Sequence, residues 1–64
     1  MPDERNIWCV TSKGGWAVKR EGFSTPLRVY NSRDEAWRAA KQLATQGHGH
    51  AFLQELDGKI RDQA

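Results

Sequence analysis

Three side chains in this chain of 64 residues could together perform nucleophilic chemistry, namely Cys9, His48 and His50. A cysteine thiolate becomes a nucleophile when a neighbouring histidine takes up its proton. Cys9, however, lies beside apolar residues in a segment typical of a strand, where a cysteine is most often part of the core. The sequence also has no nucleophile elbow and no glycine loop that cradles a phosphate. We therefore expect no enzymatic activity, no catalytic residue and no cofactor.

Metal binding is a second possibility for the two histidines. His48 and His50 flank Gly49 and could supply two ligands. A zinc site usually needs four, and no paired cysteines supply the third and fourth. The alternative interpretation of this segment is a flexible polar turn, so no metal site is predicted.

Nucleic-acid binding is a third possibility, because ten basic residues outnumber eight acidic ones and the formal charge is +2. A sheet face that combines Lys19 with Trp8 could attract phosphate and stack on a base. The candidate residues for such a surface are Lys13, Lys19, Arg20 and Arg28. Acidic residues are interspersed among them, and no recognised nucleic-acid motif is present. We keep this function as the alternative.

The length of the chain permits one domain with a small core. The single cysteine excludes an internal disulfide, and small domains are often stabilised by a second copy of themselves. No apolar run approaches the roughly 20 residues that span a bilayer, and no opening segment resembles a secretory signal. We expect a cytoplasmic protein that does not bind a membrane.

The elements that position these residues begin after a loose segment, residues 1–6, and form one domain over residues 7–64. Residues 7–11 are rich in β-branched and aromatic residues and predict a strand. Residues 16–20 predict a second strand, and the glycines at 14 and 15 predict a turn between the two. The expected register faces Thr11 with Trp16, Cys9 with Val18, Ile7 with Arg20 and, on the other side of the sheet, Trp8 with Lys19. A slip of one residue would exchange the two faces.

A short third strand is expected at residues 27–30, followed directly by a helix. Ser32 with Glu35 forms a capping-box pattern, and Gly47 is expected to end the helix. The helical wheel places four apolar residues on one face: Ala36, Ala40, Leu43 and Ala44. The alanines predict a close approach of this helix to a sheet.

The remaining residues predict two more strands. Residues 50–56 form the expected fourth strand, and Asp57-Gly58 indicates a type I′ turn into a fifth at residues 59–61. The expected fold is therefore α+β, a small antiparallel sheet with the order β-β-β-α-β-β and one helix packed on one face. The opposite face must meet water or a partner.

The chain resembles a family of small bacterial proteins known as domain of unknown function 2188. The resemblance rests on Gly15-Trp16-Ala17-Val18-Lys19 with Gly22, on Ser32-Arg33-Asp34-Glu35-Ala36 with Ala39-Ala40 and Leu43-Ala44, and on Asp57-Gly58-Lys59-Ile60-Arg61. It implies a compact α+β domain of bacteria or their phages, without an assigned activity, cofactor or catalytic residue. Trp8, Trp37 and the segment His48-Gly49-His50 are less typical of the family, so a function that depends on them would be particular to this protein.

The preferred hypothesis is protein contact, including homodimerisation, through the sheet face that the helix leaves uncovered. Trp8 and Val10 would form an exposed apolar patch there, with Lys19 beside them. An exposed edge strand offers a second route to a partner. The alternative is that Trp8 lies beneath the loop at residues 23–27. No small-molecule substrate is expected.

Overall fold

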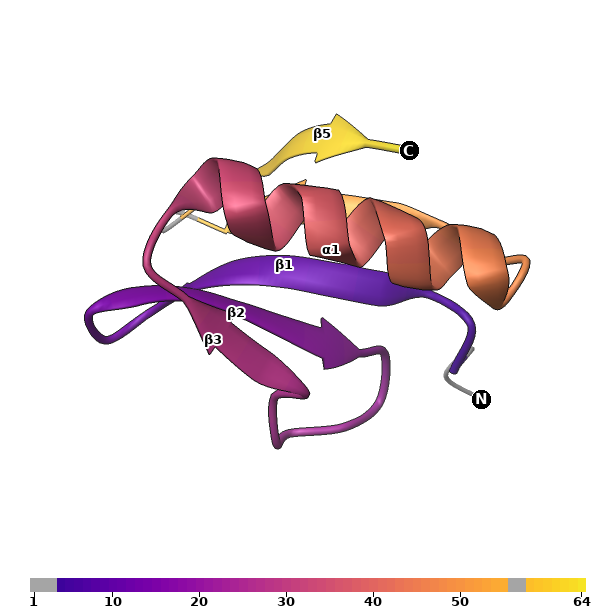
Figure 1. The fold of residues 1–64 in the computed structure, drawn as a ribbon, viewed down its shortest axis with the longest axis horizontal. Coiled ribbons are helices and arrows are strands. Elements are labelled where there is room, and N and C mark those ends of the chain that lie inside the picture. Colours follow the sequence, from indigo (N-terminus) through magenta and orange to yellow (C-terminus); the bar gives the residue numbers. More distant parts are fainter. Residues whose placement is uncertain (1–3, 56–57) are drawn as a thin grey trace.

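The computed structural model describes residues 4–55 and 58–64 (Figure 1). The elements follow the predicted order, with five strands and one helix: β1 (Ile7–Ser12), β2 (Gly15–Arg20), β3 (Arg28–Tyr30), α1 (Arg33–Gln46), β4 (Ala51–Gln54) and β5 (Ile60–Gln63). The predicted α+β class and element order are thus confirmed. Leu27 precedes the third strand, and the fourth ends at Gln54. Asp57 lies outside the described residues, so the expected turn type there is not described.

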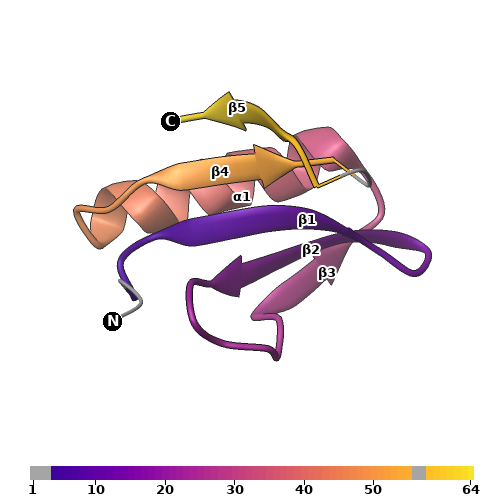
Figure 2. The same cartoon turned by 180° about the vertical axis from the view of Figure 1, so that it is seen from behind.

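The sheet is mixed, with the strand order β3-β2-β1-β4-β5. Three neighbouring pairs are antiparallel, as expected, but β1 and β4 are parallel, with Ile7 opposite Ala51. The expectation of a wholly antiparallel sheet is therefore wrong for this central pair. The two strands are parallel because α1 runs across the sheet and returns the chain to the end at which β1 begins (Figures 1 and 2).

The hairpin of β1 and β2 has the predicted register. Thr11 lies opposite Trp16, Cys9 opposite Val18 and Trp8 opposite Lys19. In the turn, Gly14 has a φ of +81°, a conformation that side chains with a Cβ rarely adopt. The turn chemistry and the alternation of the strands therefore agree on one register.

The helix begins as its capping pattern predicts. The Ser32 hydroxyl accepts a hydrogen bond from the backbone N–H of Glu35 at 3.2 Å. At the other end, the backbone N–H of Gly47 donates to the carbonyl of Leu43. Ala36, Ala40 and Ala44 are buried against the sheet, and the small size of alanine allows this close packing.

The core lies between α1 and one face of the sheet. The strands contribute alternate residues to it: Ile7, Cys9, Val18, Ala51 and Leu53. Trp16, Tyr30, Trp37 and Leu43 are partly buried and pack against this cluster. Because side chains along a strand alternate between the two faces, the residues between these core positions point away from the helix.

The N-terminal segment is tied to the fold at its end. The Asn6 carbonyl accepts from the backbone N–H of Glu21, and Asn6 Oδ1 accepts from that of His50 at 3.0 Å. The Glu4 carbonyl accepts from Arg20 Nη1 at 3.3 Å. Residues 4 to 6 are thus anchored beside the end of β2 and the start of β4.

Candidate functional site

The face of the sheet that α1 does not cover is the candidate site (Figure 2). We call it the open face. It is formed by the strand side chains that alternate with the core positions: Trp8, Val10, Ser12, Ala17, Lys19, Val29, Phe52, Gln54, Ile60 and Gln63. Six of these ten side chains are apolar. Val29 and Ile60 are half exposed, at 50% and 52%, so the face presents apolar surface near both edges of the sheet.

Trp8 on the central strand organises the middle of the open face. Its ring stacks on that of Phe52 in β4, with centroids 4.7 Å apart and planes inclined by 26°. The parallel pairing of β1 and β4 brings about this contact, since it places the two residues directly opposite each other. Trp8 is therefore half-buried by a neighbour on its own face and does not belong to the core beneath the helix.

Glu21, just after β2, holds the indole from the side. Its Oε1 accepts a hydrogen bond from Trp8 Nε1 at 3.2 Å and a longer one from Asn6 Nδ2 at 3.5 Å. These bonds satisfy the polar atom of the indole and fix the position of the carboxylate. The aromatic ring and the acidic group thus form a prearranged pair.

A shallow hollow of about 240 Å³ lies beside this pair. It is lined by Trp8, Lys19, Glu21, Gly22 and Gln54. Gln54 is held in turn by a hydrogen bond from its Nε2 to the carbonyl of Gly58 at 2.9 Å. The hollow thus combines an aromatic ring, a cation, a carboxylate and an amide.

The structure brings together the three predicted partner-binding residues, because Trp8, Val10 and Lys19 all lie on the open face. Trp8 and Val10 are each half-buried, while the most exposed apolar side chains of the sheet are those of the outer strands. The loop after β2 approaches Trp8 through Gly22, which lines the same hollow. Phe23 and Leu27 in that loop remain 49% exposed.

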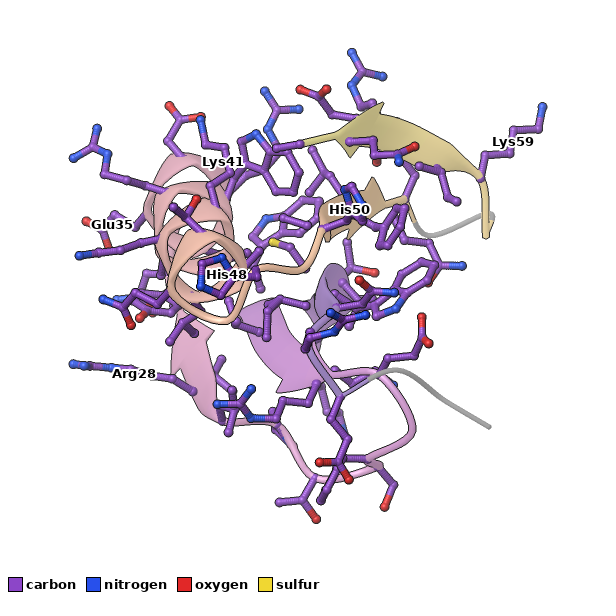
Figure 3. All side chains as sticks on the ribbon, turned by 90° about the vertical axis from the view of Figure 1, so that its right-hand side faces the viewer. Arg28, Glu35, Lys41, His48, His50 and Lys59 are labelled. Atoms are coloured by element: carbon purple, nitrogen blue, oxygen red, sulfur yellow. The ribbon has the colours of Figure 1, made fainter. Side chains whose placement is uncertain are left out.

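The four candidate nucleic-acid residues do not share one surface. Lys19 lies on the open face, whereas Arg20 and Arg28 lie opposite Ile7 and Val18 and so belong to the helix side of the sheet. Lys13 lies in the turn between β1 and β2. Figure 3 shows Arg28 extending on the side of the helix, where its guanidinium lies 5.4 Å from the Tyr30 ring centroid.

The residues of the nucleophilic hypothesis are also separated. Cys9 is fully buried, and this burial raises the pKa of its thiol to about 11, so the thiolate is scarce at neutral pH. His48 and His50 lie at the far end of α1, beyond its last turn (Figure 3). Along the strands, Cys9 and His50 are three positions apart, or roughly 10 Å. Over residues 4–55 and 58–64, no three histidine, cysteine or acidic side chains are grouped as metal ligands.

Glu21 and Phe52 are two of the site residues that sequence reasoning missed. The alternation of buried Ala51 and Leu53 in the fourth strand is a signal that Phe52 faces the other side. Glu21 has a weaker signal, because it follows the last alternating residue of β2 and only the structure shows where its side chain turns.

Comparison with protein families identifies the chain. Residues 7–64 match the family model described as an uncharacterized protein conserved in bacteria, DUF2188. The chain belongs to the DUF2188 family. The match confirms the resemblance drawn from the turn glycines and the helix start, and it spans every strand and the helix of this DUF2188 protein.

Further comparisons find no relative of known activity for this DUF2188 protein. Searches of curated proteins and of solved structures return no significant match. Within the described part of the chain, no helix has the length and apolar character needed to cross a bilayer.

Proposed function

We propose that this protein is a non-enzymatic binding module that contacts another protein chain through its open face. The observation that carries the proposal is the difference between the two sheet faces. One face is sealed by α1, while the other presents the Trp8–Phe52 stack and the half-exposed Val29 and Ile60. This sheet has apolar side chains on both faces, and the uncovered set is best buried against a partner.

The composition of the open face favours protein over nucleic acid. Tryptophan and phenylalanine are enriched in protein interfaces, where they supply large rigid contact areas. Lys19 is the one basic side chain among the ten open-face residues, and the Glu21 carboxylate lies in the same hollow. A phosphate backbone would be repelled by that carboxylate. Nucleic-acid binding by the basic residues stays the alternative, and a cytoplasmic location is part of the proposal.

Site-specific photocrosslinking tests the proposal and captures the partner in the same step. A benzophenone amino acid replaces Val29 on the open face or, as the matched control, the exposed Arg38 on α1. Both variants are expressed in bacterial cells and irradiated. We expect a discrete adduct from position 29 that protease removes and nuclease does not, and none from position 38.

Two results would count against this function. Equal adducts from positions 29 and 38 would show that the open face has no preference for a partner. Adducts from position 29 that disappear with nuclease would favour the nucleic-acid alternative.

A further inference from the structure

The hollow on the open face has the chemistry of a receptor for a cationic side chain. A carboxylate beside an indole ring attracts an ammonium or guanidinium group by ion pairing and by the quadrupole of the ring. Glu21 and Trp8 are already held together by a hydrogen bond, so a cation meets a prearranged pair. A carboxylate offers about four acceptor positions, so a cation can join the partners that Glu21 already has.

The cation that suits this hollow is present in the chain itself. Lys19 lines the hollow, and its ammonium group makes no hydrogen bond or ion pair with residues 4–55 and 58–64. It lies two positions before Glu21, a distance of roughly 7 Å along the strand direction. A two-fold axis can lie over the open face, parallel to the sheet and at right angles to β2, and cross midway between these residues. Rotation about it packs the open face of a second copy on that of the first and places each Lys19 opposite the Glu21 of the other copy.

We propose that a second copy of this chain packs on the open face about this two-fold axis, with Lys19 of each copy bound in the Trp8–Glu21 hollow of the other. The proposal rests on the proposed function, since it names the partner. The apolar open-face residues surround the two ion pairs between Lys19 and Glu21. Each copy fills the hollow of the other with its own Lys19 side chain. A standard interface takes about 800 Å² from each partner, a little under a fifth of the 4535 Å² accessible surface of the chain, so one face suffices.

Two charge-reversal variants test this arrangement. Lys19→Glu and Glu21→Lys each place two pairs of like charges in the homodimer, so each variant alone should dimerise at least about tenfold more weakly than the wild type. In a 1:1 mixture, the two carboxylates that the first variant carries at positions 19 and 21 meet the two ammonium groups that the second carries there. The mixture should therefore recover a dimer of twice the 7.3 kDa chain mass in light scattering after size exclusion.

Matched controls separate electrostatics from folding. Arg38→Glu makes the same change in net charge as Lys19→Glu, but on the outer side of α1, and should leave the dimer unchanged. Glu21→Gln removes the charge but keeps an oxygen that can accept from Trp8, so it tests the ion pair if Glu21→Lys does not fold. It should weaken the dimer, and the wild-type dimer should dissociate more readily at high salt.

A monomeric wild type at all accessible concentrations would overturn the proposal, as would a mixture that is no more dimeric than its components. Neither result would by itself overturn the proposed function, which fails when position 29 gives no adduct in cells. A photoadduct to a different protein together with a monomeric wild type would retain the binding face and exclude the second copy as its occupant.

Discussion

Oε1 of Glu21 lies 3.2 Å from the indole Nε1 of Trp8, so a residue beyond the end of β2 fixes a ring on the central strand β1. The hydrogen bond satisfies the polar atom of a tryptophan that lies on the open face. Phe52 supports the ring from one side and Glu21 orients it in its plane.

Trp8→Phe should remove this hydrogen bond and retain an aromatic ring on Phe52. The expected loss in the free energy of unfolding is about 1 kcal/mol, the usual net value of one hydrogen bond. Urea denaturation measures it. Trp37→Phe is the control, because the indole N–H of Trp37 has no hydrogen-bond partner among the described residues. Equal losses from both substitutions would mean that ring size alone matters.

Trp8→Ser and Trp16→Ser should differ in their effect on the monomer. Trp16 packs against the core cluster on the helix side, so its loss should cost about 3 kcal/mol or more, a large part of the stability of a small domain. Trp8→Ser should remain folded and bind its partner less tightly. Circular dichroism during thermal unfolding would contradict this assignment of faces if the order of the two effects were reversed.

Ala40→Leu should destabilise the contact between helix and sheet. Ala40 is fully buried at the middle of the helical face that meets the strands, so the larger side chain should cost about 1 to 3 kcal/mol by overpacking. Gln42→Leu, on the exposed side of the same helix, is the control and should be nearly neutral. If denaturant titrations showed that Ala40→Leu is more stable than the wild type, the helix and the sheet would not be packed as closely as the structure has them.

Gly15→Ala should be more harmful than Gly14→Ala. A Cβ at position 15 would collide with the backbone carbonyl oxygen of Tyr30, whereas a Cβ at position 14 meets open space and only an unfavourable φ. Gly14→Ala should cost about 1 kcal/mol, and Gly15→Ala more, because β2 and β3 must separate. Urea midpoints of the two variants give the comparison, and equal midpoints would argue against close packing of these strands.

The stability of the protein should fall between pH 9 and pH 11 because of Cys9. Its pKa is raised from 9.0 to about 11 by burial, so the unfolded chain loses the thiol proton first. The folded state then binds more protons than the unfolded state, and the free energy of unfolding decreases as pH rises, by roughly 1 to 3 kcal/mol. Comparison with Cys9→Ala isolates this effect, since the variant should show a shallower decline over the same interval.

The register of the first hairpin could be predicted from sequence because the information is local. Gly14 and Gly15 mark the turn, and the turn pairs Thr11 with Trp16, which fixes the residues of the two strands that share a face. The helix start is local in the same way, since Ser32 caps a backbone N–H only three residues ahead.

The parallel pairing of β1 with β4 could not be predicted in this way. Strand direction and order depend on how α1 crosses the sheet, which no short pattern in either strand records. The site shares this limitation. Trp8 and Lys19 can be assigned to one face because they pair within the hairpin, but Phe52 and Glu21 join them only through the crossover and the turn after β2.

The first strand of the chain is also the central strand of the sheet. β1 is bordered by β2, which follows at once, and by β4, which comes after the helix. On a ribosome, the edge of β1 that receives Ala51 therefore stays without a partner until β4 has been made. A chain that terminated before that residue would retain a bare central edge and an unsealed core, which makes incomplete products targets for proteases and for chaperones.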